Sequence, residues 1–403
     1  MPAGMRSFSS LGATVGAVAI LITSLIGCGG DSSSSTSGAS ADELFEQGPF
    51  EVGYREITIS YSEAATLEDR ELLLRVWYPA QEGSGKPPAT YAVGGIINLP
   101  AVYALDAPPV TDQENLPFVV HSHGNGAEGL LAYPYGELMA SHGWVLVAPN
   151  HTGNTAFDFL DMPDPFTRSA LDRPTDISTI IDEFESGLSG DELAGKADTS
   201  SVFLFGHSFG GYTTFVSGGA AVDFDGIEAD CEGVMSAACD LIANPDVEAA
   251  YRAGFLDERI VALAPQAPAI GSIADGELAK LEVPTMLMSG LLDQTTTQEE
   301  SAVPAWMSLD HQDDLWVEMP KGAHFSFISI CHDLSQDLLD FFRPDAGQDG
   351  CGPGFIDTQE ALPVLAAYVL AFGRRHVLGQ TEWDPILTGP PLGNDGDFIV
   401  RVK

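Results

Sequence analysis

The chain has 403 residues, 44% of them hydrophobic, which is enough for one large α/β domain or two small ones with a sizeable core. Its 17 basic and 58 acidic residues give a formal net charge of −41. Such an acidic surface repels nucleic acids and anionic lipids, so we exclude nucleic-acid partners and expect membrane contact only through an anchor.

The first 28 residues have the features of an export signal. Arg6 is basic, and the apolar run Leu11–Ile26 is too short for a comfortable membrane span. The stretch Leu25-Ile26-Gly27-Cys28 resembles the lipobox of bacterial lipoproteins, which implies cleavage before Cys28 and a lipid on its sulfur. Residues 29–48 would then be a Gly/Ser-rich tether. We expect an exported lipoprotein at the outer membrane, in the periplasm or on the cell surface. The alternative is an ordinary secretion signal with a chance cysteine, and so a secreted protein.

Four more cysteines follow Cys28. An even number of cysteines in an exported chain favours disulfides, and four cysteines allow three connectivities. Our hypothesis pairs the nearest neighbours, Cys231 with Cys239 and Cys331 with Cys351. Free buried thiols are the alternative, which export out of the cytosol disfavours.

The predicted elements change along the chain from antiparallel strands to parallel βαβ units. Alternating residues predict two antiparallel strands, Tyr54–Tyr61 and Arg70–Tyr78. Short apolar runs separated by helical stretches then predict parallel βαβ units. The expected parallel strands are Phe118–Ser122, Trp144–Pro149, Val202–Phe205, Ile260–Ala264, Thr285–Ser289 and Leu315–Met319. The expected helices are Leu130–His142, Pro174–Ser189, Tyr212–Gly218, Gln298–Met307 and Asp357–Val377, with Pro174 in a first helical turn.

These elements predict an α/β fold, with a mostly parallel eight-stranded sheet and helices on both faces. The domain is expected over residues 49–380, followed by a C-terminal tail at 381–403. Two insertions, 152–173 and 220–258, follow the fourth and fifth strands at the edge where open α/β sheets bind ligands. We interpret them as a lid region and candidate pocket walls; the alternative is that they are surface excursions.

A strand, a tight turn and a helix are expected around Ser208. The stretch Gly206-His207-Ser208-Phe209-Gly210 matches G-x-S-x-G in that context. The serine of such an elbow sits in a strained turn, and Gly206 and Gly210 let strand and helix pass almost in contact. The helix N-terminus beyond Ser208 favours developing negative charge. Ser208 is therefore predicted to be a nucleophile; an incidental serine in a Gly-rich turn is the alternative.

A serine nucleophile needs a base within hydrogen-bond reach, and the base needs an acid that fixes its tautomer. In one recurrent order the serine comes first, the acid next and the histidine last. Asp293 closely follows the strand Thr285–Ser289, and His324 follows the strand Leu315–Met319, so both are expected at one sheet edge. We predict Asp293 as the acid and His324 as the base, with His332 as the runner-up for the base.

Two backbone N–H groups are expected to stabilise an oxyanion. One would come from Phe209, directly after the serine, and the other from the loop after the third strand. In the loop stretch His121-Ser122-His123-Gly124-Asn125-Gly126 we choose the N–H of Asn125. The alternative is that His123 and Gly124 merely turn the chain.

The same loop contains a second pattern, because residues 124–129 match G-x-G-x-x-G. A dinucleotide site would need an acid about 20 residues further on, at the end of the next strand. That strand ends in Ala148-Pro149-Asn150-His151 and offers none. His121 and His123 alone are weak support for a metal site, so we expect neither a metal nor another cofactor.

Together these residues resemble an α/β-hydrolase. The chain is most similar to predicted dienelactone-hydrolase-like and platelet-activating-factor acetylhydrolase-like esterases, over roughly residues 50–378. The stretches that carry the resemblance are His121–Gly124, Arg173-Pro174-Thr175-Asp176, Gly206–Gly211, Gly322–Phe327 and the following Cys331. Two departures stand out: dienelactone hydrolases proper have a cysteine nucleophile, and acetylhydrolases proper place the acid after the preceding strand.

The resemblance implies a serine hydrolase that cleaves carboxylic esters through an acyl-enzyme, with Ser208, Asp293 and His324 as its triad. The substrate would be a small-molecule, lipid or polymer ester, including short-chain phospholipids or cutinase-like polyesters, and we expect a monomer. A hydrolase-shaped surface binding lipoprotein without catalysis is the alternative from another class.

Overall fold

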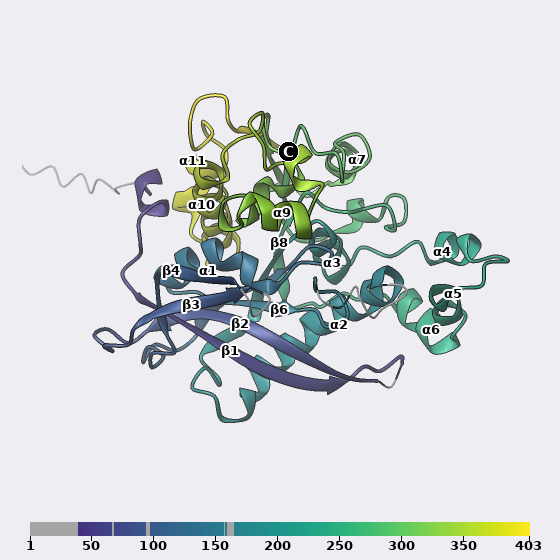
Figure 1. Ribbon diagram of the computed structural model, residues 1–403, viewed down its shortest axis with the longest axis horizontal. Coiled ribbons are helices and arrows are strands. Elements are labelled where there is room, and N and C mark those ends of the chain that lie inside the picture. Colours follow the sequence, from purple (N-terminus) through teal and green to yellow (C-terminus); the bar gives the residue numbers. More distant parts are fainter. Residues whose placement is uncertain (1–38, 67, 94–96, 157, 159–164) are drawn as a thin grey trace, which may run out of the picture. The chain divides into compact units, whose positions relative to one another are not determined.

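One mixed sheet organises the part of the chain that the computed structural model describes, which is residues 39–403 without 67, 94–96, 157 and 159–164 (Figure 1). Its 11 strands lie in the order β11-β10-β9-β8-β7-β5-β6-β2-β1-β4-β3. They are β1 (Glu51–Ser62), β2 (Asp69–Ala80), β3 (Pro88–Val93), β4 (Ile97–Asp106), β5 (Leu116–Ser122), β6 (Val145–Asn150), β7 (Ala197–His207), β8 (Ile260–Gln266), β9 (Met286–Gly290), β10 (Leu315–Met319) and β11 (Ile399–Val402). Strands β5 to β10 pair in parallel, and β1 pairs antiparallel with β2. The predicted α/β class and parallel set are confirmed.

Helices cover both faces of the sheet. They are α1 (Tyr133–Ser141), α2 (Pro165–Ser186), α3 (Phe209–Ser217), α4 (Phe224–Asp230), α5 (Ala237–Ile242), α6 (Pro245–Ala253), α7 (Ala302–Ser308), α8 (Ile330–Asp333), α9 (Gln336–Phe342), α10 (Thr358–His376) and α11 (Asp384–Leu387). Neighbouring residues of β7 show the two layers. Phe203 and Phe205 pack in one buried cluster with α1 and α10, whereas Val202 and Leu204 pack in another with α2, α3 and α7. Burial on both sides explains why this strand is apolar without alternation.

Three strands lie beyond the predicted eight, so the predicted strand count was too low. β3 and β4 extend one edge of the sheet, and β11 extends the other. β4 contains Pro100 and has side chains that are mostly not buried, as befits a strand near a sheet edge. β11 comes from the expected tail and pairs antiparallel with β10. At the other end Leu44, within the expected tether, is fully buried. The folded unit therefore extends on both sides of residues 49–380.

Pro174 lies inside α2 and not in its first turn, which corrects the predicted helix start. A proline within a helix lacks the N–H that would bond the carbonyl four residues earlier. That carbonyl belongs to Ala170, and it accepts a hydrogen bond of 3.1 Å from the hydroxyl of Tyr212 instead. A side chain of α3 thus satisfies the group that Pro174 leaves unpaired.

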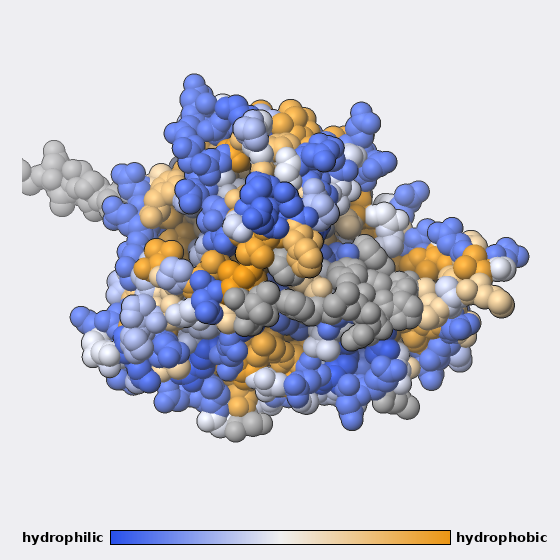
Figure 2. Space-filling model, viewed as in Figure 1, coloured by the Kyte–Doolittle hydropathy of each residue, from blue (hydrophilic) through white to orange (hydrophobic). Residues whose placement is uncertain are grey.

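The second insertion forms a lobe of α4, α5 and α6 (Figure 1). Tyr251 and Phe224 of this lobe pack in one buried cluster with Phe209 and Tyr212 of α3, so the lobe adjoins the helix that follows Ser208. The predicted disulfide between Cys231 and Cys239 is present and closes a loop at the lobe. Figure 2 shows apolar surface on this lobe among hydrophilic surroundings.

The predicted signal, Cys28 and the tether up to residue 38 lie outside the described residues. Within the described part of the chain, no helix combines the length and apolar character needed to cross a bilayer.

Candidate active site

The turn between β7 and α3 holds Ser208 in an unusual backbone conformation. Its φ is 58° and its ψ is −114°, a strained conformation for a residue with a side chain. The close approach of strand and helix requires glycine on both sides. A Cβ atom at Gly210 would lie 1.9 Å from the carbonyl oxygen of Ser122, and one at Gly206 would lie 2.5 Å from that of Gly210. The tight turn at Ser208 is therefore possible because Gly206 and Gly210 have no side chains.

The structure brings Ser208, His324 and Asp293 together in a line of hydrogen bonds. The Oγ atom of Ser208 lies 2.9 Å from Nε2 of His324, and Nδ1 of His324 lies 3.0 Å from Oδ2 of Asp293. All three residues are at least nine-tenths buried. They come from the ends of β7, β9 and β10, because the carboxyl ends of parallel strands meet at one sheet edge.

The loop after β9 orients the carboxylate of Asp293. Its Oδ1 atom accepts hydrogen bonds from the backbone N–H groups of Thr295 and Thr296, at 2.9 and 2.7 Å. The hydroxyl of Thr296 lies 2.9 Å from Oδ2 of Asp293 and 3.2 Å from Nδ1 of His324. These contacts leave Oδ2 of Asp293 facing the imidazole and hold it there.

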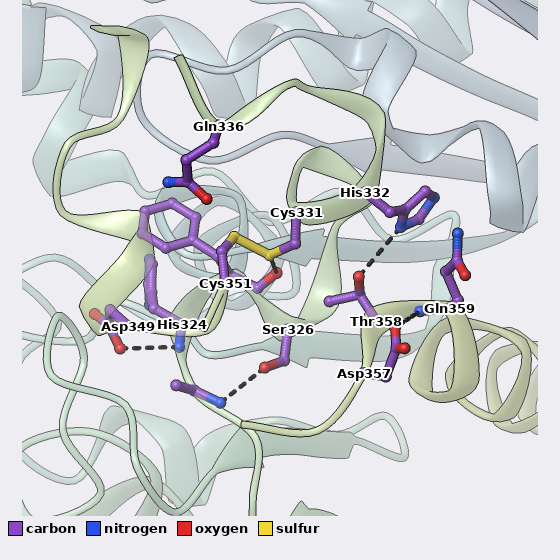
Figure 3. The surroundings of a disulfide bond; sticks show 12 residues. His324, Ser326, Cys331, His332, Gln336, Asp349, Cys351, Asp357, Thr358 and Gln359 are labelled. Carbon is purple, nitrogen blue, oxygen red and sulfur yellow. Dashed lines mark hydrogen bonds between the residues drawn. A yellow bond between two sulfur atoms is a disulfide. The ribbon is translucent and has the colours of Figure 1, made fainter. Parts of the chain in front are cut away.

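The backbone of His324 is held by hydrogen bonds at both its N–H and its carbonyl oxygen. The N–H of its backbone donates to the carboxylate of Asp349 at 3.2 Å, near the disulfide that joins Cys331 to Cys351 (Figure 3). Its carbonyl oxygen accepts a hydrogen bond of 2.8 Å from Nε2 of His207. Burial lowers the pKa of His207 well below 6.5, so this ring is neutral and donates from Nε2 alone. The second predicted disulfide is thus present beside the histidine loop.

Both segments predicted to supply oxyanion donors lie beside Ser208. Phe209 is the first residue of α3 and follows Ser208 directly. Asn125 follows Gly124, where an added Cβ atom would lie 3.4 Å from the Cβ of Ser208. The side-chain oxygen of Asn125 accepts a hydrogen bond of 2.8 Å from Asn154. The loop after β5 therefore contacts the elbow directly.

A buried polar network behind the elbow was not predicted. Arg173 is fully buried and bonds the loop after β5, while Asp176 accepts hydrogen bonds from Arg70 and approaches His151 within 2.8 Å. Burial alone would raise the pKa of Asp176, but the charge and hydrogen bonds of Arg70 and His151 together hold it below its usual range. Only the resemblance of Arg173–Asp176 to esterase sequences signalled this network, because hydrophobic periodicity does not register buried charges.

The runner-up histidine has other partners. Nδ1 of His332 lies 3.1 Å from the hydroxyl of Thr358 (Figure 3). Its Nε2 lies 3.3 Å from Asp333. In the second glycine pattern, a Cβ atom at Gly129 would lie 2.4 Å from the carbonyl oxygen of Ala148. This glycine allows the loop to pack closely against β6.

Among the described residues, no group of three or more potential ligand side chains could hold a metal ion.

The architecture has a counterpart among solved structures. A ferulic acid esterase from Streptomyces cinnamoneus matches with a TM-score of 0.59 and 17% identity, over 87% of this chain and 96% of that one. The chain has the α/β-hydrolase fold. No family model and no curated protein matches the sequence. In this fold, β3, β4 and β11 lie outside the eight predicted strands.

Proposed function

We propose that the protein hydrolyses carboxylic esters through an acyl-enzyme. One observation carries the proposal: the 2.9 Å contact from Oγ of Ser208 to Nε2 of His324, continued at 3.0 Å to Asp293. A hydroxyl, an imidazole and a carboxylate in this order are the parts of a serine nucleophile with its base. The strained φ of Ser208 and its place before a helix support the same role.

The reaction follows from these contacts. As Oγ of Ser208 attacks the ester carbonyl, its proton passes to Nε2 of His324. Asp293 keeps the Nδ1 proton in place and stabilises the imidazolium. The N–H groups of Asn125 and Phe209 would hold the oxyanion. His324 then gives its proton to the leaving alcohol. Water attacks the acyl-enzyme and passes a proton to His324, which returns it to Oγ of Ser208 as the bond to the acyl group breaks and the acid departs.

The ferulic acid esterase supports a carboxylic ester as the substrate class. The resemblance to dienelactone-hydrolase-like and acetylhydrolase-like sequences adds small esters and short-chain phospholipids, and cutinase-like polyesters are consistent with the same chemistry. A panel of p-nitrophenyl esters of increasing acyl length, with a phospholipid and a polyester film, would rank these substrates.

The test is Ser208→Ala against Ser200→Ala, an exposed serine on the same strand β7. Ser208→Ala is expected to reduce kcat for a p-nitrophenyl ester about 10⁶-fold, because the three side chains act as a unit. Ser200→Ala should retain full activity. A fluorophosphonate probe should label Ser208 in the wild type. Absence of labelling together with absence of turnover would favour a binding protein without catalysis.

We further propose that the mature protein is a lipoprotein anchored at Cys28, as the lipobox resemblance implies. Mass spectrometry of the mature N-terminus tests this. A mass without lipid, or cleavage elsewhere than before Cys28, would overturn it and favour a secreted protein.

A further inference from the structure

Arg173 is a fully buried cation that contacts the loop after β5 at several points. Its guanidinium donates hydrogen bonds to the carbonyl oxygens of His123 at 2.5 Å and of Gly124 at 3.2 Å. It also donates to Oδ1 of Asn154 at 2.6 Å. Burial lowers the pKa of Arg173 to about 9, which leaves the group charged at neutral pH. In this loop the positive charge faces uncharged groups, namely two backbone carbonyls and, at 3.3 Å, Nδ1 of His123.

The bond to Gly124 has a geometric consequence for Asn125. The carbonyl of Gly124 and the N–H of Asn125 belong to one planar trans peptide, so they point in opposite directions. The guanidinium of Arg173 at 3.2 Å and Nδ1 of His123 at 2.7 Å both bond this carbonyl, and together they fix the direction of the N–H. The guanidinium also polarises the peptide and makes the N–H a better donor. The side chain of Asn125 is held by Asn154, which Arg173 itself bonds.

The same guanidinium reaches the second proposed donor. The Arg173 guanidinium carbon lies 4.7 Å from the centre of the Phe209 ring, in a cation–π contact. Phe209 is the residue whose N–H follows Ser208. One buried cation therefore bonds the peptide group that carries the Asn125 N–H and contacts the ring of Phe209.

We propose that Arg173 is the positioning residue of the oxyanion hole. It aligns the Asn125 N–H, holds Phe209, and adds a preorganised positive charge behind the site where negative charge develops. This inference rests on the proposed ester hydrolysis. Since the charge and alignment matter most in the tetrahedral state, loss of Arg173 should lower kcat much more than it changes KM.

The experiment compares Arg173→Gln and Arg173→Lys with Arg168→Gln. Arg168 lies on the same helix α2 and pairs with Asp172 and Glu68. For Arg173→Gln we expect kcat for a p-nitrophenyl ester to fall about 100-fold, with KM within about threefold of the wild type. Arg173→Lys should recover part of the loss, because charge returns without the planar fork. Arg168→Gln should keep the wild-type kcat.

The decisive readout is binding of a boronic acid, which forms a tetrahedral adduct with a serine nucleophile. Its affinity should fall for Arg173→Gln in proportion to kcat/KM, whereas that of a non-reactive ester analogue should stay constant. Asn154→Ala, which removes the hydrogen bonds of Asn154 to Asn125 and to Arg173 but leaves the bonds of Arg173 to the loop after β5, should show a smaller loss of the same kind and serves if Arg173→Gln does not fold.

Three outcomes are separable. A folded Arg173→Gln with less than threefold change in kcat and boronate affinity would overturn the inference and leave the proposed hydrolysis standing. A fall in thermal stability and kcat without a selective loss of boronate affinity would also overturn it, since that indicates a structural role alone. A wild type that neither reacts with the fluorophosphonate nor turns over esters would overturn the proposed function, and this inference with it.

Discussion

The carboxylate of Asp349 accepts a hydrogen bond of 3.2 Å from the backbone N–H of His324 (Figure 3). It also accepts from the backbone N–H of Gln294 at 2.9 Å and from the hydroxyl of Thr295 at 2.7 Å. One buried side chain thus joins the loop of His324 to the loop that carries Asp293. Asp349 therefore ties together the two loops, after β9 and after β10, from which Asp293 and His324 of the proposed triad come.

The disulfide between Cys331 and Cys351 should therefore matter for catalysis as well as for stability. It closes a segment of 20 residues that contains Asp349. Replacing both cysteines by serine should lower stability by about 2–4 kcal/mol. Freed of this restraint, Asp349 would hold the two loops less firmly. We expect kcat to fall about tenfold with little change in KM, measured below the melting temperature, since misplacement of catalytic groups is costly.

Cys231 and Cys239 supply the control, because their disulfide closes a shorter segment of eight residues in the lobe. Their double serine variant should lose somewhat less stability, while kcat falls much less. Equal losses of kcat in the two double variants would contradict a special role for the segment around Asp349.

The elbow should not tolerate a methyl group at Gly210. Gly210→Ala would place a Cβ atom 1.9 Å from the carbonyl oxygen of Ser122, so β5 and α3 must separate. We expect a loss of stability of about 3 kcal/mol or more, read from urea unfolding, with nearly complete loss of ester hydrolysis. Gly271→Ala is the control, because a Cβ atom there meets nothing within 4 Å. A Gly210→Ala variant of wild-type stability would contradict the close approach.

The sequence predicted the parts of this molecule whose signals are local. The apolar runs gave the six parallel strands, and the G-x-S-x-G pattern gave a turn whose glycines and Ser208 have the expected geometry. Strand ends placed Asp293 and His324 at the edge where the structure brings them together, because parallel strands put their carboxyl ends on one side.

Contacts between distant segments were not accessible in this way. β11 is only four residues long and is a strand because β10 offers an open edge. Asp349 follows His324 by 25 residues, and in a chain with 58 acidic residues nothing in the sequence distinguishes it from a solvent-exposed acid. Arg173 is buried against backbone carbonyls that no pattern of hydrophobicity reports. These residues depend on how loops pack, which single-sequence periodicity does not encode.

Buried histidines should make the fold sensitive to acid. Burial lowers the pKa of His121 to about 3 and that of His151 to about 4, from 6.5 in each case. Between about pH 4 and 6.5 the unfolded chain binds protons at these rings and the folded chain does not, so stability falls as the pH falls. Asp172 opposes this, since burial raises its pKa to about 6 and stability gained from it grows as pH falls from 6 to 3.8. The pKa is also lowered at His123, His142, His207 and His376 and raised at Glu137, Asp314 and Asp333. Because the histidines outnumber these carboxyls, the melting temperature should decrease steadily from pH 6.5 to 4.5. His151→Gln should flatten that slope. A wild-type melting temperature that stays constant or rises over this range would contradict the assignment of these rings as neutral in the folded protein.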